Sequence, residues 1–176
     1  MSFGNVKFFQ LRLKKVRTKK LLTIAKKIRK ITYRHKVKFI INDNYRLVSK
    51  INADGCHIGQ NDGSIKIAKK KLKRKILGVT CHNSIELANK AVSYNVTYLA
   101  FGSFFKSKLK PKAKKASFKI LNQAKKKFRK PIVVIGGINN LNYKSLIKMG
   151  AKYIAISSFI WDNPDLKPEI AIRKFK

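Results

Sequence analysis

The feature that most constrains this chain is a repeated pattern of a short apolar strand, a loop and an amphipathic helix. β-Branched and other apolar residues predict seven strands. Because these strands are apolar throughout and alternate with helices, they indicate a parallel sheet covered by helices. The predicted strands span residues 7–11, 38–41, 55–58, 76–80, 98–102, 131–135 and 153–157.

Helical periodicity is clearest in residues 18–33 and 84–94, where apolar side chains recur on one face. Ser84 is a natural N-cap for the second of these helices. Shorter helices are expected after Tyr45, Ser64, Ser117 and Asn142, and a last one over about residues 165–175.

This alternation fits either a TIM-type (β/α) barrel or an open doubly wound sheet. No Gly-rich dinucleotide fingerprint follows the first strand, and polar residues gather at the carboxyl ends of the strands. Barrel enzymes place their chemistry at those ends. The sequence therefore predicts an α/β, TIM-type barrel that forms a single domain over residues 1–176.

The charge of the chain raises the alternative of nucleic-acid binding, since 43 lysines and arginines face 7 acids. The lysines are spread along the whole chain, however, and outnumber the arginines, which favours a solvated basic surface with no specific nucleic-acid partner. The apolar runs are too short to cross a bilayer and the start does not resemble a signal peptide, so a cytoplasmic protein without a membrane partner is expected. Cys56 and Cys81 lie in predicted strands and are expected to be buried, reduced thiols.

Two of the few acids occupy equivalent positions, because Asp43 and Asp62 each close a segment that contains a predicted strand. Carboxylates that follow neighbouring strands can share a divalent cation, so the pair predicts a metal site. Taken singly, Asp43 would also suit an Asx turn and Asp62 a cap for the helix that begins near Ser64.

A series of motifs follows the strands in order along the chain. The motifs are Gln10-Leu-Arg12-Leu-Lys14, Asn42-Asp43, Asp54-Gly-Cys-His57-Ile-Gly59-Gln60-Asn-Asp62, Gly78-Val-Thr80-Cys-His82, Gly136-Gly137-Ile138 and Gly150-Ala-Lys-Tyr-Ile-Ala-Ile156-Ser157. Together they resemble the thiamine phosphate synthase and thiazole tautomerase superfamily. The match runs in order from about residue 7 to residue 160, and the order makes it specific.

The resemblance implies a transferase of thiamine biosynthesis, which joins a pyrimidine diphosphate to a thiazole phosphate and releases diphosphate. In that family the bond between the pyrimidine methylene and the diphosphate oxygen breaks first, and the thiazole nitrogen captures the resulting cation. The protein must therefore stabilise the departing diphosphate, which Mg²⁺ and surrounding cationic side chains can do.

The resemblance also implies roles for individual residues. Asp43 and Asp62 would ligate Mg²⁺. The groups implied around the diphosphate are Arg12, Lys14, Lys110 and Thr80, taken as catalytic, together with Asn42. On the substrate side, Gln10 would contact the pyrimidine, Ser107 would replace one family hydroxyl near the thiazole, and the backbone amides of Gly137, Ile156 and Ser157 would cradle the thiazole phosphate.

The chain departs from the family pattern in two respects. Leu109 stands where the family has a threonine that contacts the thiazole side, and the seven strands leave the barrel without its first βα unit. A truncated start, an incomplete barrel and a dimer that covers the gap all fit this pattern, so a homo-oligomer stays open. The alternatives to an active synthase are a tautomerase-like protein, an inactive truncated homologue and a basic nucleic-acid-binding protein.

Overall fold

The computed structural model describes residues 6–106 and 115–175. It divides into two compact units, Met1–Val79 and Thr80–Lys176. The described residues contain seven strands, as the sequence predicted, and the strands within each unit pair in parallel. Among the described residues, no helix combines the length and apolar character that crossing a bilayer requires.

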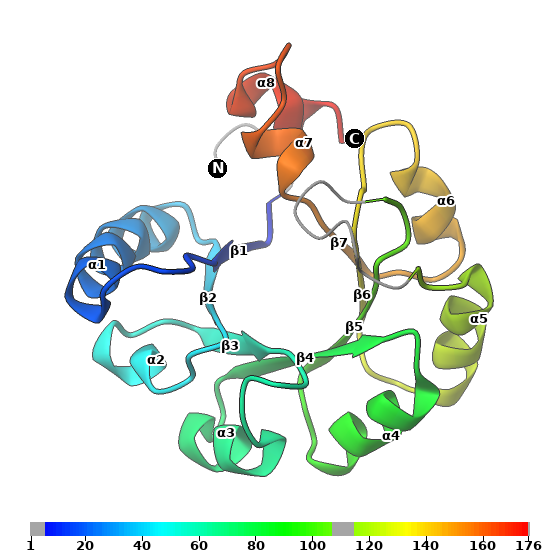
Figure 1. The fold of residues 1–176 in the computed structure, drawn as a ribbon, viewed down its shortest axis with the longest axis horizontal. Coiled ribbons are helices and arrows are strands. Elements are labelled where there is room, and N and C mark those ends of the chain that lie inside the picture. Colours follow the sequence, from blue (N-terminus) through cyan, green and yellow to red (C-terminus); the bar gives the residue numbers. More distant parts are fainter. Residues whose placement is uncertain (1–5, 107–114, 176) are drawn as a thin grey trace. The chain divides into compact units, whose positions relative to one another are not determined.

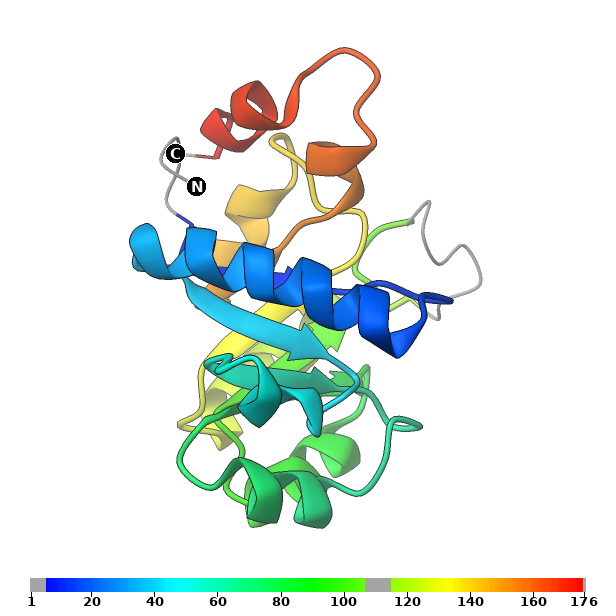
Figure 2. The ribbon, with the colours of Figure 1, turned by 90° about the vertical axis from the view of Figure 1, so that its left-hand side faces the viewer.

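The first unit alternates strands with helices, and its strands pair in chain order. Figure 1 shows its three helices on the same side of the strands, and Figure 2 shows α1 running alongside β2. Its elements are β1 (Phe8–Leu11), α1 (Thr18–Arg34), β2 (Lys38–Asn42), α2 (Leu47–Lys50), β3 (Gly55–Ile58), α3 (Ile65–Leu72) and the start of β4 (Ile76–His82).

The second unit repeats the pattern, with β5, β6 and β7 paired in chain order. Tyr143 of α6 and Phe159 of α7 both pack against Phe175, with ring centroids 5.2 and 5.4 Å away, which anchors the end of the chain. After the end of β4, its elements are α4 (Ile85–Ser93), β5 (Tyr98–Gly102), α5 (Phe118–Lys127), β6 (Ile132–Ile135), α6 (Tyr143–Lys148), β7 (Tyr153–Ala155), α7 (Ser158–Trp161) and α8 (Pro168–Arg173).

Side-chain caps start three of the helices where the sequence placed serines. The Ser84 hydroxyl accepts a hydrogen bond from the Leu87 amide at 3.0 Å, which confirms the predicted N-cap of α4. Ser64 and Ser117 cap α3 and α5 in the same way. These bonds satisfy amides that the first turn of a helix otherwise leaves without a partner.

The predicted boundaries were wrong near the end of the chain. The strand expected over residues 153–157 stops at Ala155, and the short helix α7, which the sequence did not predict, follows at Ser158. The last helix begins only at Pro168, because the Asn163 side chain first accepts bonds from the Asp165 and Leu166 amides and holds a turn. Proline favours the first helical turn, where its missing N–H costs nothing.

The core explains why the strands are apolar throughout. Phe39, Ile40 and Ile41 of β2 are consecutive, point to alternate faces and are all buried. Leu99, Ala100 and Phe101 of β5 are buried in the same way. Burial on both faces is typical of a parallel sheet covered by helices, and it leaves the strand ends as the place for polar side chains.

Candidate functional site

Asp43 directly follows β2, in a backbone conformation that few side chains adopt. Its φ is 65°, in the left-handed region that Asp and Asn tolerate better than most residues. The Asp43 amide donates to the His57 carbonyl of β3 at 2.8 Å, and the Asn44 amide donates to the Asn42 carbonyl at 2.8 Å. Main-chain bonds therefore hold the turn that presents this carboxylate.

Asp62 lies in the loop after β3 and is held by that loop. The Gly59 amide donates to Asp62 Oδ2 at 2.8 Å. The helix that follows is capped by the Ser64 hydroxyl, which accepts from the Ile67 amide. The alternative that Asp62 serves as that helix cap is therefore wrong, and its carboxylate is turned back towards the end of β3.

The structure brings Asp43 and Asp62 together, as the metal hypothesis requires. The pKa of Asp43 is raised above its ordinary value of 3.8, first by burial, then by a hydrogen bond with the Asp62 carboxyl group and by the charge of Asp62. Lys14 and Arg12 act in the opposite direction and lower the pKa of Asp43. Two acids and two cations from neighbouring strand ends thus act on one another at one place.

Gln10 and Asn42 lie beside each other at the same end of the first unit. Gln10 Nε2 donates to Asn42 Oδ1 at 3.2 Å, which joins β1 to the last residue of β2. Because its amide oxygen accepts this bond, Asn42 keeps its amide N–H groups as donors for an anion. The structure therefore groups all six of the predicted site residues that lie in the first unit.

Cys56 lies close enough to Asp43 and Asp62 to be affected by their charges, but its thiol stays neutral. Burial, followed by the charges of Asp43 and Asp62, raises the pKa of the Cys56 thiol to about 12. Burial likewise raises the pKa of Cys81 to about 12. Both cysteines are buried thiols, as predicted, and a neutral thiol is a weak nucleophile and metal ligand.

The donor set fits Mg²⁺ better than a transition metal. In the described part of the chain, no group of three or more His, Cys, Asp or Glu residues could hold a metal ion. Mg²⁺ commonly binds through one or two carboxylates and completes its octahedron with waters and substrate phosphates. The carboxylates of Asp43 and Asp62 meet that requirement, and the nearby Arg12 and Lys14 suit an anionic substrate.

In the second unit, the predicted phosphate loop follows β6. Gly137 has φ 61°, and its carbonyl accepts from Asn142 Nδ2 at 3.0 Å. A side chain at Gly137 would collide with the Lys106 carbonyl oxygen and the Phe105 side chain. The glycine is thus required by the close approach of the chain that follows β5, a packing reason that sequence reasoning did not identify.

The other predicted residues of this unit lie in β4, between β7 and α7, or outside the described residues. Thr80 lies within β4, while Ile156 and Ser157 lie in the turn between β7 and α7. The Ser157 carbonyl accepts from the Ile160 and Trp161 amides, at 2.9 and 3.0 Å. Ser107, Leu109 and Lys110 lie outside the described residues.

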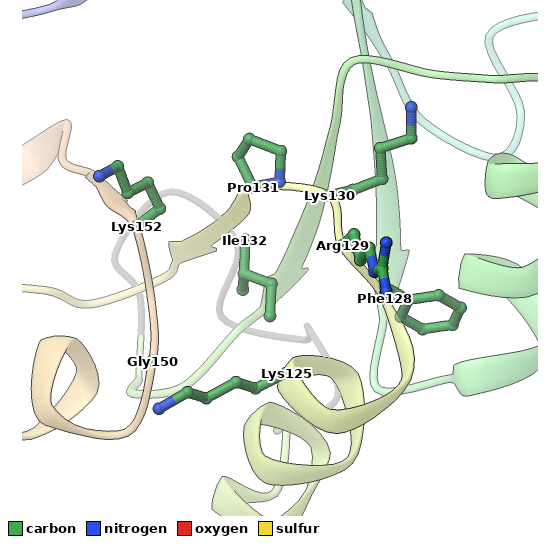
Figure 3. A pocket seen from close by; sticks show the side chains of 8 residues that line it. All are labelled: Lys125, Phe128, Arg129, Lys130, Pro131, Ile132, Gly150 and Lys152. Carbon is green, nitrogen blue, oxygen red and sulfur yellow. The ribbon is translucent and has the colours of Figure 1, made fainter.

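Two hollows lie at the amino ends of strands and are not the candidate site. Figure 3 shows one of about 270 Å³ in the second unit, where the ammonium groups of Lys125, Lys130 and Lys152 point in different directions. The other, of about 480 Å³, lies in the first unit, where Arg29 and Lys38 meet Asp54. Neither is lined by a predicted site residue, and cations that diverge do not make an anion site.

Sequence reasoning left two residues of the first unit without a role. Asp54 was noted only as part of a motif, yet its Oδ2 lies 2.6 Å from Arg29 Nη1 and accepts from the Phe39 amide at 2.8 Å. Gly59 was likewise quoted without the bond that it makes to Asp62. The only signal in the sequence was the short polar segment from Gly59 to Asp62, whose length fits a turn.

Parallel strands alternating with helices, with acids and cations at strand ends, define the chain as a TIM-type α/β protein with a charged candidate site at the strand ends. The particular family follows from its relatives. Residues 1–160 match the family model described as thiamine monophosphate synthase, and the chain belongs to that family.

Curated relatives bear this name. The thiamine-phosphate synthase of Pelagibacter ubique (strain HTCC1062) is 52% identical over 176 residues, which are 100% of this chain and 85% of the relative. The thiamine-phosphate synthase of Alcanivorax borkumensis is 39% identical over 163 residues, 92% of this chain and 75% of the relative. The resemblance inferred from the motifs is therefore confirmed.

Solved structures confirm the fold. The thiamine phosphate pyrophosphorylase from Pyrococcus furiosus aligns with a TM-score of 0.88 and 27% identity, covering 97% of this chain and 81% of that chain. A 3-hexulose-6-phosphate synthase, at 17% identity, aligns with a TM-score of 0.71 over 96% of this chain and 85% of that chain, and it shows the fold alone. The α/β, TIM-type prediction was correct.

Proposed function

We propose that this chain is a thiamine phosphate synthase, which joins hydroxymethylpyrimidine diphosphate to a thiazole phosphate. The family membership supports the reaction, and the meeting of Asp43 and Asp62 beside Arg12 and Lys14 is the observation that carries the mechanism. The bond between the pyrimidine methylene carbon and the diphosphate oxygen breaks, and the diphosphate leaves with the electron pair. The lone pair of the thiazole nitrogen then forms the new carbon–nitrogen bond, so no general base is needed.

In this proposal the residues of the first unit hold the diphosphate. Arg12 and Lys14 supply positive charge, and Asn42 supplies amide donors because Gln10 occupies its oxygen. Gln10 also contacts the pyrimidine side. Asp43 and Asp62 would hold Mg²⁺, which would supply positive charge to the leaving diphosphate.

The roles proposed for residues of the second unit rest on the family membership. Thr80 and Lys110 contact the diphosphate, and Ser107 offers a hydroxyl near the thiazole. The amides of Gly137, Ile156 and Ser157 hold the thiazole phosphate. Support comes from the tight loop after β6, where the Asn142 side chain bonds the Gly137 carbonyl, and from the turn that starts α7 at Ser157.

The burial and crowding of the acids support the metal assignment. The charge of Asp62 raises the pKa of Asp43, which shows that the two carboxylates repel each other. A divalent cation bound by both would attract each of them and offset this repulsion. Perturbed acids of this kind gather at functional sites. The same pair has no evident purpose in a tautomerase-like protein or in a basic nucleic-acid-binding protein, neither of which needs to hold diphosphate and metal.

A direct assay tests the proposal. The purified protein is incubated with both phosphorylated precursors and Mg²⁺, and the release of diphosphate and formation of thiamine phosphate are measured. We expect product that depends on Mg²⁺ and is lost in Asp43→Asn and in Asp62→Asn. The matched control is Asp165→Asn, which removes the same charge from an exposed position in the turn before α8 and should keep full activity.

Two outcomes would contradict the proposal at different levels. A folded protein that makes no thiamine phosphate under these conditions would exclude the synthase activity. Product formation that Asp43→Asn and Asp62→Asn leave unchanged would instead exclude the metal ligands while keeping the reaction.

A further inference from the structure

Gly59 makes a contact that no reaction step requires but that decides where Asp62 points. Its amide donates to Asp62 Oδ2 at 2.8 Å. A methyl group built on Gly59 would lie 2.7 Å from the same oxygen and 3.8 Å from Asp62 Cγ. Apart from its chain neighbours, it would meet no other atom of the described residues within 4 Å. Carbon does not approach a non-bonded oxygen this closely without something moving, so the two residues fit only because position 59 has no side chain.

We propose that Gly59 is the positioning residue for the metal-binding carboxylate of Asp62. The inference rests on the proposed function, because it assumes that Asp62 binds the cation. The amide bond fixes one carboxylate oxygen, and the missing side chain leaves that oxygen room to lie against the loop. With Oδ2 held in this way, the carboxyl group stays turned towards Asp43.

The rest of the loop supports a directed role for Gly59. The loop from Gly59 to Asp62 follows directly on β3, whose His57 carbonyl accepts the amide of Asp43. Main-chain hydrogen bonds at the end of β3 therefore hold both the backbone of Asp43 and the carboxylate of Asp62. Such support from the main chain preorganises the two acids for a shared cation.

The variant Gly59→Ala tests this inference through metal binding, measured without turnover. Binding of Mn²⁺, a paramagnetic substitute for Mg²⁺, is followed by electron paramagnetic resonance in the presence of inorganic diphosphate. Changing a residue that orients a metal ligand weakens metal binding by about 10- to 100-fold. Because the methyl group of Gly59→Ala displaces the Asp62 carboxylate, we expect the affinity for Mn²⁺ to fall in that range. Asn61→Ala, which trims an exposed side chain in the same loop, is the matched control and should bind Mn²⁺ normally.

A double-variant cycle tests whether Gly59 acts through Asp62. Gly59→Ala should lower the unfolding temperature of the otherwise unaltered chain without metal, because the methyl group displaces the carboxylate. In the Asp62→Ala background the methyl group no longer meets the Asp62 carboxylate, so Gly59→Ala should not lower the unfolding temperature. If Gly59→Ala alone does not fold, recovery of the fold in the double variant would support the inference equally.

The outcomes separate this inference from the proposed function. Normal Mn²⁺ binding by Gly59→Ala, with binding lost in Asp62→Ala, would overturn the role of Gly59 and leave the metal site intact. Normal binding by Asp62→Ala would overturn the metal role and the positioning role together. A destabilising effect of Gly59→Ala that persists in the Asp62→Ala background would also overturn the inference, because the methyl group would then act on another part of the chain.

Discussion

The two ends of strand β3 carry carboxylates in opposite electrostatic settings. At the amino end, Asp54 contacts Arg29 Nη1 at 2.6 Å and Lys38 Nζ at 3.5 Å. Past the carboxyl end, Asp62 faces another acid, Asp43, and burial and crowding raise the pKa of Asp43. The same residue type thus stabilises the fold at one end of the strand and opposes it at the other.

The contrast suggests different purposes for the two pairs: Asp54 with Arg29 stabilises the fold, and Asp43 with Asp62 serves the proposed reaction. Both Asp54 and Arg29 are mostly buried, with 18% of each side chain exposed, and the Phe39 amide supplies a further bond to Asp54. A buried carboxylate with these partners is fully compensated. The Asp43 carboxylate is crowded by Asp62, and the proposed Mg²⁺ would offset that crowding.

The largest expected effect comes from neutralising one member of the acidic pair. Asp62→Asn should lower kcat/KM by about 100- to 1,000-fold, the scale on which a single preorganised electrostatic group acts in a transition state. Its free energy of unfolding should stay the same or rise, because one repelling charge is gone. Steady-state kinetics and urea unfolding of the same preparation measure both quantities. A variant that loses stability and activity in parallel would erase the contrast between the two ends of β3.

The second prediction concerns Asp54, whose loss should lower stability and leave activity intact. Asp54→Ala should lower the free energy of unfolding by about 2–3 kcal/mol, because Arg29 then stays largely buried without its carboxylate. Activity per folded molecule should be kept well below the unfolding temperature. Urea unfolding measures the loss, with Asp165→Ala as a control that changes stability by less than about 0.5 kcal/mol. Loss of activity without loss of stability would place Asp54 in the site instead.

A smaller effect is expected in the pH dependence of stability. The pKa of Asp43 is raised in the folded protein, so as the pH rises from below 3.8 the unfolded chain loses its proton first. The folded state then holds the extra proton, and the stability contributed by this group falls as the pH rises through the higher pKa. The difference in urea midpoint between Asp43→Asn and the unaltered chain should therefore grow with pH. A difference that is constant across this range would mean that Asp43 titrates normally.

The smallest effect on stability is expected for Lys38, the more exposed of the two cations that contact Asp54. The Lys38 side chain is 58% exposed, and its Nζ lies 3.5 Å from Asp54 Oδ1. Exposed ion pairs contribute little, so Lys38→Ala should change the free energy of unfolding by less than about 0.5 kcal/mol. Arg29→Ala should cost clearly more, because it removes the short bond to Asp54 and the contact with Tyr33, whose ring centre is 5.5 Å from the guanidinium carbon. Equal effects of the two variants would show that burial does not distinguish them.

Local patterns in the sequence were enough for the order of the elements. The apolar strands and the serine caps of α3, α4 and α5 are local features, because β-branched runs and N-cap hydroxyls act within a few residues of themselves. The end of the chain was less predictable. The segment after Ala155 keeps an apolar character but turns into α7, which no local signal distinguished from a longer strand.

The sequence predicted that Asp43 and Asp62 meet, but not the contacts that hold them in place. The positions of Asp43 and Asp62 after neighbouring strands implied that they meet, because parallel strands bring their carboxyl ends to one edge. The bond from Gly59 to Asp62 and the packing of Lys106 against Gly137 carried no comparable signal. Both depend on how closely two pieces of main chain approach, and side-chain type alone does not encode that distance.

The sequence by itself determined the alternation of strands and helices, the family and the acids at the strand ends, since each is carried by short-range patterns or by motifs in a fixed order. Only the tertiary structure decided which carboxylate meets which partner. Asp54 and Asp62 look equivalent along the chain, on either side of one strand. Arg29, 25 residues away, neutralises the first, while the turn after β2 brings Asp43 to the second. The energy of a charge depends on its neighbours in space, and those are known only once the chain has folded.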